Sequence, residues 1–177
     1  MFNSLNALTT LIYQNQEEAT KFVKQLSKVY RYVLDIKDQE VIALSKELEF
    51  LSSYTFMQKT RHNDGLFIDV QVPSNDACIV PLSLQMLVEN AIKHNEISKE
   101  NPLKVNIFTD NDYLVVSNNL QKRPPREAGS SSIGLENIKN RYQFLTDNPV
   151  SVEDGPENFI VRIPLLHISD LNEKREN

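Results

Sequence analysis

The sequence predicts an α+β protein: an N-terminal helical hairpin or bundle, followed by a two-layer α/β sandwich. Residues 1–62 hold no glycine and no proline, whereas the rest of the chain alternates strand-like with helix-like patterns. After residue 62 the predicted order is strand, helix, two strands, loop, helix and two strands. This order favours one mixed sheet with helices on one face. We expect a helical region at 1–62, a second domain at 63–168 and a frayed tail at 169–177.

The first predicted helices carry a regular apolar stripe. Its members fall on alternating three- and four-residue steps, a pattern of helix packing: Leu5, Leu8, Ile12, Ala19, Phe22, Leu26, Val29, Val33 and Ile36. Asn15 takes the one polar place in the series and is a good N-cap, with Glu17 and Glu18 in the turn after it. We therefore expect two helices joined at Asn15. A plain helical hairpin would suffice, but so regular a stripe favours dimerisation through a bundle.

The remaining elements follow from local patterns. A third helix is expected to begin with Ser45 as its cap and Glu47 and Glu49 in its first turn, and to bury Leu48, Leu51, Tyr54 and Met57 or their neighbours. Alternation at 67–72 predicts a half-buried strand after the turn Asn63-Asp64-Gly65. Further along we expect a helix that begins near Pro81 and an antiparallel pair of strands at 103–119 that turns at 110–112. A loop at 120–132 should follow, and then a helix from Ile133. This helix should bury Ile138, Tyr142 and Leu145, and a hairpin that turns at 154–156 should end the fold.

Composition excludes several classes of function. The net charge of −5 argues against a nucleic-acid partner, because neutralising phosphates needs a basic surface. Cys78 is the single cysteine, so no disulfide can form within the chain. No apolar run approaches the roughly 20 residues that cross a bilayer. We expect the chain to be a cytoplasmic part of a longer membrane protein, with the membrane reached only through segments absent here.

The stretch "LVENAIKHN" at 87–95 is unusually polar for a helix with so apolar a neighbourhood. On a helix, Gln85, Glu89, Asn90, Lys93 and His94 would lie opposite an apolar arc. A solvated face is the ordinary interpretation. However, Asn is a poor helix former in mid-helix, and an amide oxygen beside a carboxylate can hold Mg²⁺ that bridges to phosphates. A lysine one turn later can meet those phosphates.

At this point the sequence resembles a known family. "PLSLQMLVENAIKHN" is similar to the N-box of the ATP-binding domains of sensor histidine kinases and GHL-type ATPases, and more narrowly to LytS/YehU-type sensor histidine kinases. "MFNSLNAL" resembles the end of that group's phosphoacceptor motif. "LSKVYRYVL", "LSKELEFLSSYTFMQKTRHND" and "SSIGLENIKNRYQFL" also resemble its typical segments. The resemblance runs from residue 1 to about 165 and implies a Bergerat-type ATP-binding fold.

The resemblance also implies roles for individual residues. Asn90 would ligate Mg²⁺, and Glu89 would order the water shell of the metal as a second catalytic residue. Lys93 and His94 would face the triphosphate of ATP. Ser132, Ile133, Gly134 and Leu135 would form the phosphate loop at a helix start, with Gly134 allowing close backbone approach. Asn137 and Arg141 could contact the nucleotide from the side of the flexible loop that would cover it, or they could be surface residues. A glycine at a helix start with no ligand is the simpler interpretation of Gly134 taken alone.

Two departures from the family pattern matter. The family has an Asp-x-Gly segment whose carboxylate binds the adenine amino group. Here Asn118 stands at the Asp position and Leu120 at the Gly position. An amide can still accept that bond but loses charge assistance, about 1 kcal/mol. Met86 stands where hydrolases of the superfamily place a general-base Glu four residues before the Asn, so ATP hydrolysis is not the expected purpose of the site.

The acceptor histidine of the motif would precede Phe2, and His62, His94 and His167 do not stand in that motif. We therefore expect a kinase core that binds Mg-ATP for phosphoryl transfer to a histidine outside residues 1–177. Alone, it should not autophosphorylate. The expected partners are a second copy, through the N-terminal helices, and a response regulator receiver domain. The expected location of the full-length protein is the bacterial inner or plasma membrane. The competing hypothesis is a degenerate module that dimerises and binds a partner without nucleotide.

Overall fold

The computed structural model describes residues 2–73, 76–122 and 133–167. The helices are α1 (Phe2–Gln14), α2 (Gln16–Asp35), α3 (Leu44–His62), the short 3₁₀ helix η1 (Asn63–Gly65), α4 (Ser83–His94) and α5 (Ile133–Gln143). The strands are β1 (Ile42–Ala43), β2 (Leu66–Gln71), β3 (Cys78–Ile79), β4 (Leu103–Asp110), β5 (Tyr113–Asn119), β6 (Ser151–Asp154) and β7 (Asn158–Pro164).

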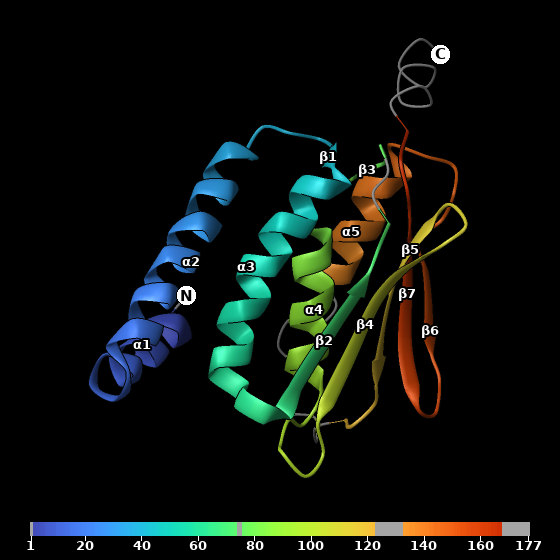
Figure 1. The fold of residues 1–177 in the computed structure, drawn as a ribbon. Coiled ribbons are helices and arrows are strands. Elements are labelled where there is room, and N and C mark those ends of the chain that lie inside the picture. Colours follow the sequence, from blue (N-terminus) through green and yellow to red (C-terminus); the bar gives the residue numbers. More distant parts are fainter. Residues whose placement is uncertain (1, 74–75, 123–132, 168–177) are drawn as a thin grey trace.

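The larger sheet has five strands in the order β2-β4-β5-β7-β6. β2 and β4 are parallel, and the other neighbours are antiparallel, so the sheet is mixed. Helices α3, α4 and α5 lie side by side over one face of this sheet, with α4 in the middle (Figure 1). The expected α+β class, with a mixed sheet and helices on one face, is confirmed.

The core lies between the sheet and these helices. Along β4, Leu103, Val105 and Ile107 are buried while the residues between them are exposed, as the two-residue period of a strand requires. They pack with the apolar face of α4, of which Leu84 and Val88 are fully buried. Each such side chain stabilises the fold by about 1.5–3 kcal/mol relative to exposure. This packing fixes which flanks of α4 remain available for chemistry.

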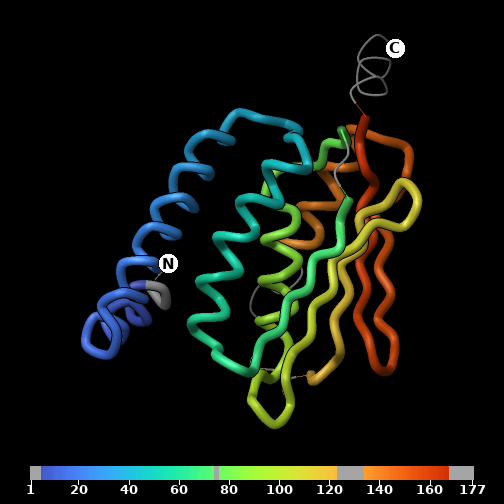
Figure 2. The backbone as a smooth tube through the Cα atoms, in the orientation of Figure 1, coloured from blue at the N-terminus to red at the C-terminus, as the bar shows by residue number. Residues whose placement is uncertain are grey.

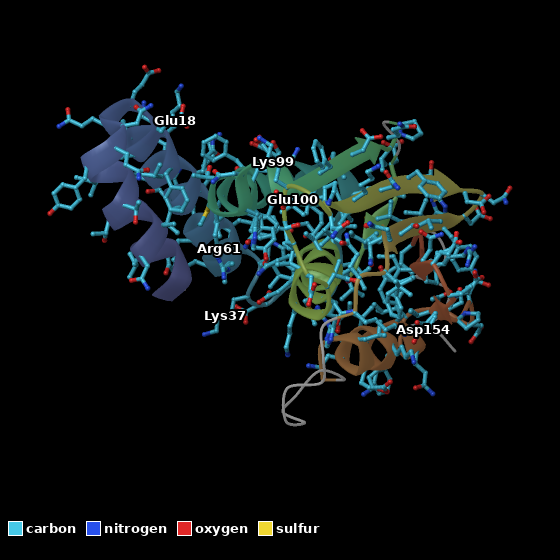
Figure 3. All side chains as sticks on the ribbon, turned by 90° about the horizontal axis from the view of Figure 1, so that it is seen from below. Glu18, Lys37, Arg61, Lys99, Glu100 and Asp154 are labelled. Carbon is cyan, nitrogen blue, oxygen red and sulfur yellow. The ribbon has the colours of Figure 1, made fainter. Side chains whose placement is uncertain are left out.

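The N-terminal helices α1 and α2 fold back on each other beside α3, away from the sheet (Figure 2). The break falls where the sequence predicts it. The Asn15 side chain caps α2 and accepts hydrogen bonds from the backbone N–H of Glu17 and Glu18, both at 3.1 Å. Only Ala19 and Phe22 of α2 are buried among the described residues, so this helix keeps most of its surface exposed. Seen from below, Glu18 of α2 and Asp154 of β6 lie on opposite sides of the molecule (Figure 3).

The expected Ser45 cap of the third helix is wrong. α3 begins at Leu44, and its N-cap residue Ala43 makes no side-chain cap. The start of this helix is fixed by pairing: β1 pairs with β3, and the Leu44 N–H donates to the Ala77 carbonyl at 2.9 Å. Glu47 is consequently buried in the fold instead of lying in a solvated first turn.

The other local expectations fare better. Leu51, Tyr54 and Met57 are buried and Leu48 is partly buried, as expected for the inner face of α3. The β4–β5 turn occurs where expected, with Asn111 in the left-handed region at φ 51°. The final hairpin turns between β6 and β7 as expected. The division at residues 62 and 63 stays a prediction, and α3 shares one core with the later elements. Within the described residues, no helix is long and apolar enough to span a membrane.

Candidate nucleotide-binding site

Helix α4 runs between α3 and α5 and presents a different flank to each. Its buried residues form a single arc: Ser83, Leu84, Leu87, Val88, Ala91 and Ile92. Its N-cap residue, Leu82, is in the left-handed region at φ 65° and provides no side-chain cap. Such a conformation costs about 1 kcal/mol or more for a non-glycine residue, so the surroundings must hold it in place.

The flank toward α5 carries Met86, Asn90 and His94, which follow one another at four-residue steps. A Cβ atom added at Gly134 would lie 3.6 Å from the Met86 Cε, which places the start of α5 against this flank. That distance is an ordinary contact, so the protein's own packing does not demand a glycine there. Asn90, one turn beyond Met86, is partly buried near this helix start, where backbone N–H groups are unsatisfied by the helix itself.

The outermost residue of α4 is Lys93, which is exposed. Among the described residues no carboxylate lies within salt-bridge distance of its ammonium group. His94, on the following position, is partly buried. A cation for which the described residues supply no carboxylate, on the same helix as a half-exposed amide, is a set of groups suited to an anion.

The opposite flank of α4 carries Gln85 and Glu89. Glu89 is exposed, and its charge, after burial, contributes to the raised pKa of Tyr54 on α3. The polar residues that the sequence groups on one side are thus divided over two flanks: Glu89 lies toward Tyr54 of α3, and Asn90 shares the flank of Met86, which lies beside Gly134. The catalytic role expected of Glu89 stays a prediction.

The end of α4 is joined to the segment after β5. Asn95 is buried, donates its amide to the Ala91 carbonyl at 2.8 Å and accepts from the Gln121 N–H at 2.7 Å. Asn118 of β5 is also buried, at 3 % exposure, and pairs with Val105 on the strand face that the helices cover. Its amide nitrogen donates to the Asn119 carbonyl at 2.7 Å, which leaves the side-chain oxygen as the acceptor. Asn118 therefore lies on the face of the sheet that the helices cover.

The phosphate-loop residues expected from the sequence are only partly within the described chain. Ser132 lies outside it, and Ile133 opens α5 without a described side chain. Gly134 and Leu135 are partly buried, and Leu135 packs against the core. The structure thus brings Gly134 toward Met86, which lies one helical turn before Asn90. Asn137 is exposed, and Arg141 donates a hydrogen bond to the Pro81 carbonyl, before the start of α4.

Sequence reasoning missed the buried polar group at the other end of α4. Glu47 of α3 is fully buried and accepts hydrogen bonds from the N–H groups of Leu82 at 3.2 Å and Leu84 at 3.3 Å. The Tyr32 hydroxyl of α2 donates to the same carboxylate. Burial raises the pKa of Glu47, although these hydrogen bonds and the charge of Arg141 act in the opposite direction.

Two residues of α5 complete this group. Arg141 donates to the Pro81 carbonyl at 3.2 Å, and the Tyr142 hydroxyl accepts from the Val80 N–H at 3.3 Å. We call Tyr32, Glu47, Arg141 and Tyr142 the α4 anchor. The sequence signal for it was weak, because an early glutamate in a helix usually serves its own helix, whereas Glu47 serves one that begins 36 residues later (83 minus 47).

The metal expected from the sequence would depend on one amide, Asn90, and not on a cluster of protein ligands. No group of three or more His, Cys, Asp or Glu side chains within them could hold a metal ion. Mg²⁺ commonly takes one or two protein oxygens and completes its shell with water and substrate phosphates. Asn90 could supply such an oxygen, with Lys93 and the start of α5 nearby for the phosphates.

Comparison with known proteins gives concordant matches. A family model described as histidine kinase matches residues 1–66. The sensor protein LytS of Staphylococcus epidermidis is 32% identical over 120 residues, which are 66% of this chain and 20% of that protein. The sensor histidine kinase YpdA of Escherichia coli is 36% identical over 95 residues, or 53% of this chain and 17% of that protein. The sensor protein LytS of Bacillus subtilis is 32% identical over 131 residues, which are 71% of this chain and 22% of that protein. This chain belongs to the sensor histidine kinase family.

The kinase family assignment rests on these sequence matches. Among solved structures, the cytoplasmic segment of the histidine kinase QseC is similar with a TM-score of 0.49 at 16% identity, covering 85% of this chain and 94% of that one. The chain spans about a fifth of the length of LytS, 20% in the match above. The resemblance to the LytS type seen in the sequence is confirmed by the same matches.

Proposed function

We propose that this chain is the nucleotide-binding portion of a two-component sensor histidine kinase and that it binds Mg-ATP. The observation that carries the proposal is the approach of Gly134 to the flank of α4 that bears Asn90, at 3.6 Å between a Cβ on that glycine and Met86. It joins a metal-ligating amide to a helix start that can bind phosphate. Lys93, exposed on the same part of α4, adds the positive charge.

In this proposal each residue has a defined part. Asn90 would ligate the Mg²⁺ ion, and Lys93 and His94 would face the phosphates. The backbone of residues 132–135 would approach the phosphates, as Gly134 allows. The Asn118 side-chain oxygen would accept a hydrogen bond from the adenine amino group, since its nitrogen is already engaged with Asn119. Glu89 would act from the edge of the site on the metal's water. The magnesium ion supplies charge neutralisation for phosphoryl transfer.

The phosphoryl group would go to a histidine, which serves as the nucleophile. None of His62, His94 and His167 stands in the phosphoacceptor motif, so in this proposal the acceptor is not one of them. Radiolabelled ATP should therefore leave no acid-labile label on this chain. Label that appears on it and is lost in acid would contradict this part of the proposal.

We also propose homodimerisation through α1 and α2. Several large apolar side chains on these helices are exposed in the single chain, among them Leu5, Ile12, Val23, Val33 and Leu34. Leu5, Ile12 and Val33 belong to the helix-packing stripe of the sequence, and a second copy would cover them. A response regulator receiver domain would then take the phosphoryl group from the acceptor histidine. The whole protein would lie in the inner or plasma membrane of a bacterial cell, with this part in the cytoplasm.

The competing hypothesis is a module that dimerises without using nucleotide. Asn118 in place of the family's aspartate is the feature that favours it, because an amide gives a weaker hydrogen bond to adenine than a carboxylate does. This difference concerns the base, whereas Asn90, Lys93 and Gly134 concern the phosphates. We therefore favour a site that binds nucleotide and whose affinity depends less on the adenine base than on the phosphates.

A thermal-shift titration separates the two hypotheses. Mg-ATP at a hundred times its dissociation constant should stabilise the chain by about 2.7 kcal/mol, which raises the midpoint by several degrees. Asn90→Ala should abolish the magnesium-dependent part of the shift while the ligand-free midpoint stays or rises slightly, since Ala is the better helix former. Asn140→Ala is the matched control, because Asn140 is an exposed helical asparagine of α5. No shift of the unmodified chain at millimolar Mg-ATP would favour the competing module.

A further inference from the structure

The α4 anchor places a buried carboxylate where a helix cap is missing. Leu82, the N-cap residue of α4, provides no side-chain cap and lies in the left-handed region. Glu47 supplies the acceptor instead and binds the N–H groups of Leu82 and Leu84, with one carboxylate oxygen for each. A negative charge at a helix N-terminus also meets the positive end of the helix dipole. The position of the first turn of α4 therefore depends on a residue of α3.

The same carboxylate connects α4 to the N-terminal helices. Tyr32 lies near the end of α2, and its hydroxyl donates to the Glu47 oxygen that also accepts from Leu82. The Tyr32 ring stacks on Phe50 of α3, with ring centroids 4.1 Å apart. The rest of α2 is largely exposed, with only Ala19 and Phe22 buried among its described residues. Tyr32 is thus a specific polar contact between a largely exposed helix and the residue that binds the start of α4.

A carboxylate buried to this extent is costly unless its partners are correctly placed. An apolar residue of similar size would fill the same volume without that cost. The arrangement is therefore better explained by what the hydrogen bonds position than by net stability. What they position is α4, whose second half carries Asn90 and Lys93 and whose Met86 lies beside Gly134.

We propose that Glu47 and Tyr32 are positioning residues of the nucleotide site, which hold the first turn of α4 in a place set by α2. A displacement of α2 would change the hydrogen bond to Glu47, shift the first turn of α4 and move Asn90 relative to the start of α5. The effect on ligand affinity rests on the proposed nucleotide function, whereas the mechanical link between Tyr32 and α4 does not.

The test compares Tyr32→Phe with Tyr30→Phe in the full chain. Tyr32→Phe removes the hydroxyl but keeps the stacking ring, and Tyr30 is a tyrosine of the same helix that is 41% exposed. Amide hydrogen exchange of the nucleotide-free protein, followed by NMR, should quicken about fivefold at Leu82, Leu84 and the rest of the first turn in Tyr32→Phe only, as expected for one lost hydrogen bond. Exchange at Val115 and Val116 of β5 should stay unchanged.

A second substitution checks that the hydroxyl acts through the carboxylate. In a Glu47→Met background, Tyr32→Phe should add nothing to exchange at the first turn, because the acceptor is already gone. If Glu47→Met does not fold, Glu47→Gln takes its place, and the added effect of Tyr32→Phe should then be smaller than in the unmodified chain. Tyr32→Phe should also weaken Mg-ADP binding severalfold while Tyr30→Phe leaves the dissociation constant unchanged.

The outcomes are separable. Unchanged exchange at the first turn in Tyr32→Phe, or faster exchange spread equally to β5, would overturn the inference, since the latter is general destabilisation. The inference would also be overturned if Tyr32→Phe raised the exchange rate at the first turn of α4 as much in the Glu47→Met background as it does in the unmodified chain. If Mg-ADP does not bind even the unmodified chain, the proposed function fails, but hydrogen exchange still decides whether Tyr32 positions α4.

Discussion

The two ends of helix α4 are built in opposite ways. At its start, Glu47 binds two backbone N–H groups and the Tyr32 hydroxyl, and α5 adds hydrogen bonds at Val80 and Pro81. In its second half, Asn90 is partly buried beside the start of α5, and Lys93 is exposed with no described carboxylate at salt-bridge distance. At the first end the backbone N–H groups are hydrogen-bonded within the protein, and at the second the Lys93 ammonium group has no carboxylate partner among the described residues.

This contrast shows how one helix can serve both folding and binding. A helix that presents half-satisfied polar groups to a ligand needs its position fixed by other contacts, and the anchor provides them at the far end. Substitutions at the start should therefore change stability first, and substitutions in the second half should change ligand binding first. The predictions below test this separation in order of expected size.

The largest effect is expected for Glu47→Ala. The substitution leaves the Tyr32 hydroxyl and two backbone N–H groups without their acceptor, which should lower the free energy of unfolding by about 3 kcal/mol. Urea denaturation measures it. Glu49→Ala, an exposed glutamate of the same helix, should change stability by no more than about 0.5 kcal/mol. Equal losses in the two variants would break the comparison, because the start of α4 would then not be held by Glu47.

A smaller effect, on binding instead of stability, is expected for Lys93→Ala. Removing this cation should weaken Mg-ATP binding about fivefold, or about 1 kcal/mol, and should reduce the dependence of affinity on salt. Isothermal titration at two salt concentrations measures both. Lys46→Ala, an exposed lysine of α3, should leave binding as it is. A loss of unfolding free energy in Lys93→Ala without any change in affinity would reverse the assignment of the two ends.

The pH dependence of stability gives the finest distinction. Burial raises the pKa of Glu47 above its ordinary value, against the opposing effects of Tyr32, the two N–H groups and Arg141, with the Tyr142 hydroxyl also close by. The folded state therefore binds the proton of Glu47 more tightly than the unfolded state does. The stabilisation that this proton binding gives to the fold is complete below the pKa of the unfolded state, near 4.5, and is lost as the pH rises through the pKa of the folded state.

Glu47→Gln cannot ionise and should lack this component. The free energy of unfolding of the unmodified chain, relative to that of Glu47→Gln, should accordingly fall as the pH rises above about 4.5. Chemical denaturation at several pH values measures the difference. A relative rise over the same range would mean that the hydrogen bonds outweigh burial and that Glu47 is ionised more readily in the fold than outside it.

What the sequence could predict was local. The Asn15 cap involves N–H groups two and three residues away, so residue type and spacing were sufficient. The alternation of β4 and β5 and their turn were likewise readable, because a strand face repeats within a few residues. The apolar arc of α4 also followed from its helical period.

What the sequence could not predict depends on contacts between distant segments. α3 starts at Leu44 and not at a Ser45 cap because β1 pairs with β3, and strands of two residues have no readable period. Helical spacing placed Glu89 and Asn90 on one polar side, but only the packing of α3 and α5 assigns them to different neighbours. From its place in the sequence, Glu47 is expected to be an acid in the first turn of its own helix. Only the fold brings it to Leu82 and Leu84, which lie 35 and 37 positions further along the chain.

The most direct test of the central claim is an NMR titration of the ¹⁵N-labelled chain with a non-hydrolysable ATP analogue, with and without Mg²⁺. The account predicts that the Asn90 side-chain amide and the Gly134 N–H shift together, that the Asn90 shift requires Mg²⁺, and that Lys93→Ala weakens both responses. Shifts confined to the outer surface of α2, or resonances of Asn90 and Gly134 that stay in place at saturating analogue, would contradict it.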